Sequence, residues 1–128
     1  MRQVIVNMKD FVFADAVAQA LRSDSGSDFA VQNISRPGEI LRYCNILSAY
    51  ALLMEVTRYG PYTLDERLGI GNAVKRAVPT CKVVLLVDEN SEKELAKQVR
   101  RAKKEGLIDQ FIYGSTSASF LVAMMDAL

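Results

Sequence analysis

Short apolar runs alternate along the chain with segments of helical periodicity. The runs are rich in branched aliphatic residues, and most carry little polar alternation, which is typical of strands buried on both faces of a parallel sheet. The second run alternates apolar and polar positions, which favours a half-exposed edge strand. The predicted strands span residues 3–8, 29–35, 49–56, 81–89 and 108–114.

The segments that follow these runs repeat apolar residues at helical spacing. Thr63 with Glu66, and Ser91 with Glu94, match the capping box that starts many helices, and Gly106 suits a helix C-cap. The predicted helices span residues 10–24, 36–47, 63–79, 90–106 and 117–128.

Strand and helix thus alternate five times, which predicts an α/β fold. Right-handed crossovers put helices on both faces of a parallel sheet, so we expect a flavodoxin-like, doubly wound (βα)₅ domain. Its five strands are expected in the order 2-1-3-4-5. One domain over residues 1–128 accounts for the whole length, and the sequence shows no internal repeat or linker.

Composition narrows the function classes. Half of the residues are hydrophobic, and 16 Lys and Arg balance 15 Asp and Glu, so the net charge is only +1. Such a balance gives no general attraction to nucleic acid or to an anionic membrane, and we expect neither as a direct partner. No apolar run reaches the roughly 18 residues of a membrane span, and no signal-peptide cleavage region follows Met1, so a cytoplasmic protein is expected.

Histidine is absent and cysteine occurs twice. The absence of histidine removes Ser-His and Cys-His nucleophile pairs, and two cysteines do not make a structural zinc site, so no enzyme activity is expected. Cys44 and Cys81 stand in apolar settings, which favours reduced, packed thiols over a disulfide.

Candidate site residues stand where the predicted strands end. In a doubly wound sheet, ligands collect outside the carboxyl ends of the strands, near the switch point between strands 1 and 3. The sequence Gly-Ile-Gly at 69–71 lies inside a predicted helix and therefore lacks the context of a dinucleotide-binding turn. The residues at the strand ends are Asn7, Met8, Met54, Glu55, Val87, Asp88 and Tyr113.

This order of elements and these strand ends resemble the receiver domain of bacterial two-component response regulators (CheY-like) along the full chain. In that family, two acids after strand 1 and an aspartate after strand 3 hold Mg²⁺, and the aspartate accepts a phosphoryl group from a kinase. A hydroxyl residue after strand 4 and a lysine after strand 5 bind that group. The resemblance implies a phosphorelay signalling domain whose partner is a kinase, an output domain or a second copy of the chain.

The chain departs from the family at each of these positions. Asn7 and Met8 stand in place of the acid pair, and Val87 stands in place of the hydroxyl residue. The acceptor position holds Met54, or Glu55 if the register moves by one residue. Tyr113 replaces the lysine. We therefore expect a degenerate pseudo-receiver that acts by protein–protein interaction, independently of phosphorylation.

Three readings of Glu55 stay open. It is a fixed negative charge that holds one signalling state, an ordinary surface carboxylate, or a non-standard phospho-acceptor of a relay protein. Asp10, Glu55 and Asp88 could together suit Mg²⁺, although Asp10 and Asp88 also suit helix capping; apart from Mg²⁺, no cofactor is expected. A further alternative is a small-molecule binder at the switch point between strands 1 and 3.

The last strand and helix provide a candidate interface. The family docks partners or dimerises through helix 4, strand 5 and helix 5, and the final helix is rich in apolar residues. The basic run at 100–104 is expected to be a solvated helix surface. The interface residues expected are Phe111, Tyr113, Met124 and Met125, with Met124, Met125 and Leu128 in an exposed apolar strip.

Overall fold

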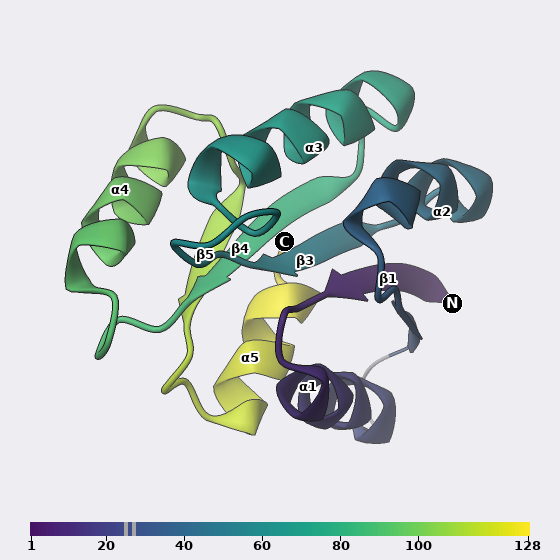
Figure 1. Cartoon of the computed structure of the whole chain (residues 1–128). Helices are drawn as coiled ribbons and strands as arrows, with labels where there is room; N and C mark the ends of the chain where they lie inside the picture. Colours follow the sequence, from purple (N-terminus) through teal and green to yellow (C-terminus); the bar gives the residue numbers. More distant parts are fainter. Residues whose placement is uncertain (25, 27) are drawn as a thin grey trace.

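The computed structural model describes residues 1–24, 26 and 28–128, and in this part of the chain five parallel strands form one sheet (Figure 1). The strand order is β2-β1-β3-β4-β5, which confirms the predicted flavodoxin-like topology. The strands are β1 (Arg2–Asn7), β2 (Phe29–Asn33), β3 (Ala51–Glu55), β4 (Lys82–Val87) and β5 (Gln110–Tyr113).

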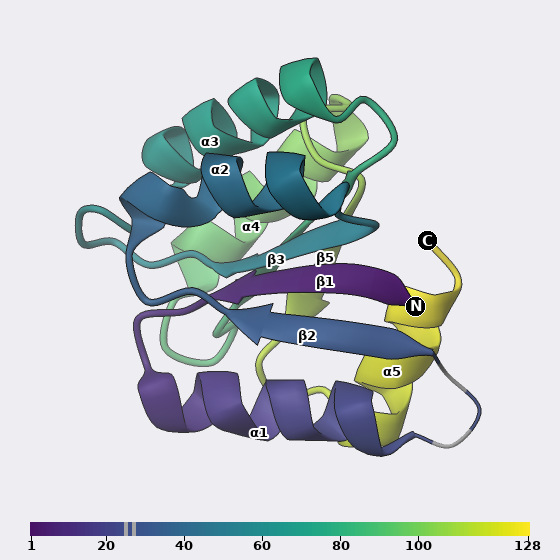
Figure 2. The same cartoon turned by 90° about the vertical axis from the view of Figure 1, so that its right-hand side faces the viewer.

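Helices cover both faces of this sheet. α1 and α5 pack on one face, and α2, α3 and α4 pack on the other, as Figure 2 shows in side view. The helices are α1 (Phe11–Ser23), α2 (Ile40–Leu47), α3 (Leu64–Ala77), α4 (Lys93–Lys104) and α5 (Ala118–Asp126).

The central strands are buried on both faces because their side chains alternate between two hydrophobic layers. Val4 and Val6 of β1 contact the α1–α5 layer, whereas Ile5 contacts the layer under α2, α3 and α4. β2 is an edge strand and its last two residues are exposed, as the alternation in its sequence predicts.

Two local predictions differ from the structure. The segment expected as one helix from residue 36 begins with a 3₁₀ turn, η1 (Pro37–Glu39), before α2. The capping box of Ser91 and Glu94 is wrong: α4 starts after Glu92 without a side-chain cap, because the Ser91 hydroxyl donates to Asp88 instead. The Thr63 cap of α3 and the left-handed Gly106 after α4 are as predicted.

Arg2 ties the two ends of the chain together at the amino end of the sheet. Its guanidinium donates to the carboxylates of Asp28 and Asp126, and it lies 4.4 Å from the ring centre of Phe29 and 4.8 Å from that of Tyr50. Asp126 is the last residue of α5, so the two termini lie side by side at the amino ends of the strands. The carboxyl ends of the strands point to the opposite side of the molecule (Figure 2).

No helix in the described ranges (1–24, 26 and 28–128) combines the length and the apolar character that crossing a membrane requires.

Candidate functional site

The carboxyl ends of β1 and β3 meet at the switch point of the sheet. Asn7 of β1 is paired in register with Met54 of β3, and the next residue, Glu55, is paired with Leu86 of β4. Asn7 is fully buried, and its side-chain amide donates to the carbonyl of Ile34 at 2.6 Å. The Asn7 side chain therefore links β1 to the segment that follows β2.

Glu55 joins the end of β3 to the loop that follows β1. Its Oε1 accepts hydrogen bonds from the backbone N–H groups of Lys9, at 2.8 Å, and Asp10, at 3.3 Å. Hydrogen bonds from backbone N–H groups to a carboxylate are charge-assisted and hold the side chain in place. Glu55 is therefore a bound carboxylate at the switch point, and not a freely solvated one.

A buried arginine fills the space between these strand ends. Arg67 of α3 has no exposed surface, and its Nε donates to the Glu55 carbonyl at 2.8 Å. Its Nη2 donates to the Asn7 carbonyl at 3.2 Å, and the Tyr62 ring centre lies 4.9 Å from the guanidinium carbon. One guanidinium thus bridges the last residues of β1 and β3.

This guanidinium is a permanent cation near neutral pH. Burial lowers the pKa of Arg67 to about 10, and the decrease is limited by Tyr62 and by the negative charges of Glu55 and Glu66. Among the residues that the structure describes, neither the third nitrogen, Nη1, nor the side-chain oxygen of Asn7 has a hydrogen-bond partner, although both atoms are buried.

The residues present do not fit a bound Mg²⁺. A hard cation needs several oxygen ligands, and here the strand ends offer a neutral amide, one carboxylate that already accepts two backbone N–H groups, and two carbonyls that already accept from Arg67. Within residues 1–24, 26 and 28–128, no group of three or more Cys, Asp or Glu side chains lies close enough to hold a metal ion. The Arg67 charge would also repel a cation placed between β1 and β3.

Asp10 and Asp88, which were predicted to form a cation site with Glu55, each accept hydrogen bonds from residues two or three positions later in the chain. Asp10 is the N-cap of α1 and accepts from the N–H of Phe13 at 3.1 Å. Asp88 accepts from the N–H groups of Asn90 and Ser91 and from the Ser91 hydroxyl. The Ser91 hydroxyl is the main cause that holds the pKa of Asp88 below its usual range.

Met8, Met54 and Val87 occupy the remaining candidate positions at the strand ends as packed side chains. All three are essentially inaccessible to solvent. Met8 borders a small hollow of about 200 Å³ beside the start of α1. Metabolite pockets commonly measure about 300–1,000 Å³, so this hollow gives little support to a small-molecule site at the switch point.

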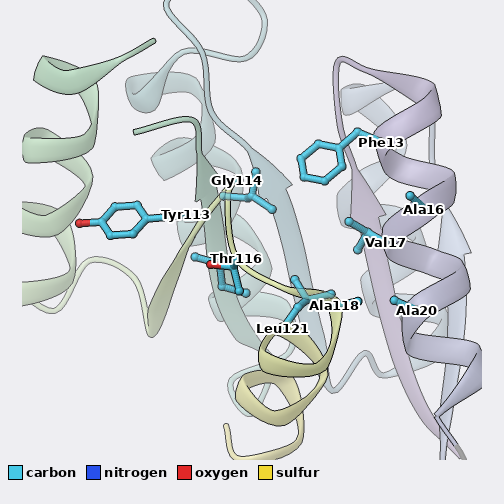
Figure 3. Close-up of a pocket in the computed structure, with 11 residues that line it drawn as sticks. Phe13, Ala16, Val17, Ala20, Tyr113, Gly114, Thr116, Ala118 and Leu121 are labelled. Atoms are coloured by element: carbon cyan, nitrogen blue, oxygen red, sulfur yellow. The ribbon is translucent and has the colours of Figure 1, made fainter. Parts of the chain in front are cut away.

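The aromatic residues of β5 lie toward α4. Phe111 and Tyr113 have ring centres 5.5 Å apart, and the Tyr113 hydroxyl accepts a hydrogen bond from Nη1 of Arg100 at 2.8 Å. In Figure 3 the Tyr113 ring points toward α4 and away from the neighbouring pocket. Tyr113 therefore joins β5 to α4 at the surface where the interface is expected.

The predicted exposed strip on α5 is wrong for Met125. Met125 is fully buried in the layer between α1 and α5, and Met124 is partly buried against the same layer. The large apolar side chain that α5 exposes to solvent is Phe120, which is 56% exposed. Leu121, Val122 and Met125 form the side of α5 that packs on the sheet, so Met125 belongs to the core and not to an exposed strip.

A small apolar pocket lies between α1 and α5 (Figure 3). Phe13 and Val17 line it from α1, and Thr116 and Leu121 line it from the other side. Its volume of about 110 Å³ suits one inserted side chain. A larger hollow of about 650 Å³ lies between α3 and the loop before β5, at the amino end of the sheet and away from the switch point.

Arg67 is the residue that the sequence analysis missed. The signal was its position: residues 67, 71, 74 and 78 follow helical spacing and are all buried, so the arginine stands on the apolar side of α3. A charged residue at such a position is rarely fully buried unless it is paired.

Solved structures with the same fold are receiver domains. A response regulator receiver domain from Clostridium thermocellum has a TM-score of 0.77 and 16% identity, covering 99% of this chain and 93% of that chain. The signal receiver domain of the response regulator NarL from Mycobacterium tuberculosis has a TM-score of 0.71 and 18% identity, covering 98% of this chain and 94% of that chain.

A further similar structure belongs to a family of redox sensors in the streptococci that evolved from two-component response regulators. Its TM-score is 0.75 at 16% identity, and the match covers 99% of this chain but 50% of that one. No family model matches the sequence, and no curated protein is significantly similar to it. The chain therefore has the CheY-like receiver fold, and its site differs from the one that the family resemblance implies.

Proposed function

We propose that this chain is a receiver-like signalling domain that works without phosphoryl transfer. The observation that carries the proposal is the Arg67 guanidinium between the ends of β1 and β3. In place of a metal ion and a reactive carboxylate, the switch point contains an internal cation and a carboxylate bound to backbone N–H groups. Both charges are part of the covalent chain, so the site is fixed in one state.

Glu55 is a weak candidate for a phospho-acceptor on the same grounds. One of its oxygens already accepts two backbone hydrogen bonds. No lysine stands at the end of β5, where the resemblance places the cation that binds a phosphoryl group, because Tyr113 occupies that position. A phosphoryl donor would therefore meet neither Mg²⁺ nor the lysine that, in the family, binds the transferred group.

The domain acts by protein–protein contact through α4, β5 and α5, in the cytoplasm. This surface carries the exposed Phe120 and the Arg100–Tyr113 hydrogen bond. Partly exposed aromatic and arginine side chains are the residue types that most often anchor interfaces. Its partner is a kinase, an output domain or a second copy of the chain.

The test is the intact mass of the protein after incubation with acetyl phosphate and Mg²⁺, with Glu55→Gln as a matched variant. We expect no phosphoryl adduct on either protein. An adduct on the wild type that is lost in Glu55→Gln would overturn the proposal and make the chain a relay protein with Glu55 as acceptor.

Sedimentation of the same two proteins and of Phe120→Ser tests the contact mode. If Glu55 holds the domain in a docking state, Glu55→Gln changes the self-association, and Phe120→Ser weakens it without disturbing the core. If all three proteins sediment as monomers over a wide concentration range, the homodimer is excluded and only a different protein remains as partner.

A further inference from the structure

The two cysteines of the chain lie in the same core layer although 36 residues, 45–80, separate them in sequence. Cys44 lies on α2, and Cys81 directly precedes β4. Both side chains are fully buried free thiols, and both belong to the hydrophobic layer under α2, α3 and α4.

Backbone hydrogen bonds hold these two positions next to each other. The N–H of Ala49 donates to the Cys44 carbonyl at 3.0 Å, which folds the end of α2 onto the start of β3. The N–H of Lys82 donates to the Tyr50 carbonyl, also at 3.0 Å, which brings Cys81 to the same place. The pair is therefore fixed by the sheet and not by a flexible loop.

The thiols interact directly, and their surroundings make them unequal. Hydrogen bonding from Cys44 lowers the pKa of the Cys81 thiol, and the ammonium of Lys75 lowers it further, against burial and the Asp109 carboxylate. Hydrogen bonding to Cys81 raises the pKa of Cys44. The thiolate is the reactive form, and the nearby Lys75 ammonium favours it at Cys81.

We infer that Cys44 and Cys81 form a redox-active dithiol that a peroxide converts to an intramolecular disulfide joining α2 to the amino end of β4. The Cys81 sulfur attacks a peroxide oxygen, the O–O bond breaks, and a sulfenic acid and water form. The Cys44 sulfur then attacks the sulfenic sulfur and a second water leaves. Two thiols and one hydrogen peroxide thus become one disulfide and two waters, with both electrons of the thiols passing to the peroxide.

The structure of α2 allows the small opening that a peroxide needs. The helix has only 8 residues, and a 3₁₀ turn precedes it. It ends at Ser48, whose φ of 48° is a left-handed conformation that non-glycine residues adopt at some cost. Short, strained elements open locally more easily than the central strands do.

The test treats the full chain with hydrogen peroxide and, separately, with diamide, then unfolds it and alkylates it with iodoacetamide before mass analysis. Reduced protein takes a label on each cysteine. Oxidised protein is expected to take no label, to be lighter by two hydrogen atoms, and to yield a peptide that links residues 44 and 81. Cys44→Ala and Cys81→Ala should not give this product.

Stability provides a second readout, because a cross-link across this span constrains the unfolded chain. Oxidation should raise the urea midpoint of the wild type and leave the midpoints of Cys44→Ala and Cys81→Ala unchanged. The inference is overturned if both thiols remain alkylatable after oxidation, or if the disulfide forms only at urea concentrations that unfold the chain. It is also overturned if each single variant gains oxygen on its remaining cysteine as fast as the wild type reacts. None of these outcomes bears on phosphoryl transfer.

Discussion

At the scale of single residues, Arg67 determines what the strand ends can do. Its charge is buried against two main-chain carbonyls, and no carboxylate in the described part of the chain forms an ion pair with it. Burying a charge is costly unless hydrogen bonds compensate for the lost water, and one of its three nitrogens has no partner among the described residues. The role of Arg67 is therefore to hold the ends of β1 and β3 together, and its net contribution to stability is small compared with the size of the buried charge.

We expect Arg67→Met to destabilise the fold by about 1–3 kcal/mol, because two buried carbonyls lose charged hydrogen-bond donors. Arg76→Met is the control on the same helix, since Arg76 is exposed and should change the free energy of unfolding by less than about 0.5 kcal/mol. Urea unfolding measures both. An Arg67→Met protein as stable as the control would show that the guanidinium has no structural role at the switch point.

Asp109 gives the molecule a defined acid sensitivity. Its carboxylate lies 2.6 Å from the Lys75 ammonium and accepts from the N–H of Val83 at 2.8 Å. Burial raises its pKa, but Lys75 and the Val83 N–H outweigh burial, so the net shift is downward. A carboxyl whose folded pKa is lowered adds stability above its unfolded pKa, which is about 3.9, and that stability is lost as the pH falls.

The urea midpoint of the wild type should therefore fall between pH 5 and pH 3, a range of about one unit on either side of that unfolded pKa. The decline should be shallower in Asp109→Asn, which has no carboxyl to protonate. Lys75→Met should flatten the profile in a similar way, because it removes the cation that lowers the pKa. Parallel profiles for all three proteins would assign the acid sensitivity to other carboxylates.

Residue roles were less predictable from the sequence than the fold. Asn7, Met8, Met54 and Val87 were recognisable as departures because the strand pattern fixed their positions. The role of Arg67 depends on which side of α3 faces the sheet, and a charged residue obscures that in a pattern of apolar positions. Met125 was misplaced for a related reason, since an apolar helix shows no polar stripe from which to infer its exposed side.

At the scale of elements, α3 shows how two nearby glycines have different consequences. Gly69 is exposed, and a Cβ added there would meet no atom within 4 Å. Gly71 is buried against β4, where a Cβ would lie 3.2 Å from Cγ1 of Val83. The close packing of α3 on the sheet, which also brings Arg67 to the strand ends, depends on the second glycine.

Gly69→Ala should stabilise the protein by up to about 1 kcal/mol, because alanine costs less backbone entropy in a helix. Gly71→Ala makes the same chemical change and should give no gain, or a loss, because the Val83 side chain must move. Thermal unfolding of the two variants measures the difference. Equal gains at both positions would mean that α3 does not pack tightly on β4.

The start of a helix was predictable from its capping residue where no other nearby acceptor competed for that residue's hydroxyl group. Thr63 caps α3 as its sequence predicts, since its hydroxyl accepts from the Glu66 N–H. Ser91 stands in an equally suitable sequence, but Asp88 lies three residues earlier and accepts a hydrogen bond from the Ser91 hydroxyl. A capping box cannot be distinguished from an aspartate turn by spacing alone, because both use the same short-range donors.

At the scale of the whole molecule, the strand order was predictable from the alternation of buried runs and helices. Right-handed crossovers leave few ways to wind five such units, and the structure adopts the flavodoxin-like one. Site chemistry is not constrained in this way, because the same sheet accommodates an acid pair or a buried arginine at its carboxyl edge.

A fixed internal cation should make the whole fold indifferent to magnesium. Binding to the native state alone would raise the free energy of unfolding by about 1.4 kcal/mol at a tenfold excess over the dissociation constant. We expect the urea midpoint to be the same with 10 mM MgCl₂, about ten times a millimolar dissociation constant, as with EDTA. A potassium sulfate control at matched ionic strength removes general salt effects. A saturable increase that is specific to Mg²⁺ would contradict the prediction.

The Arg2–Asp126 contact holds the two ends of the chain close together, so the sheet does not depend on where the chain begins. A short peptide could join the two ends at the amino edge of the sheet, and new ends could be opened at the exposed Pro79–Thr80 turn. Such a circularly permuted chain would begin with β4 and still assemble the same sheet around an unchanged switch point. The fold can thus be inserted into, or fused to, another protein through either pair of ends.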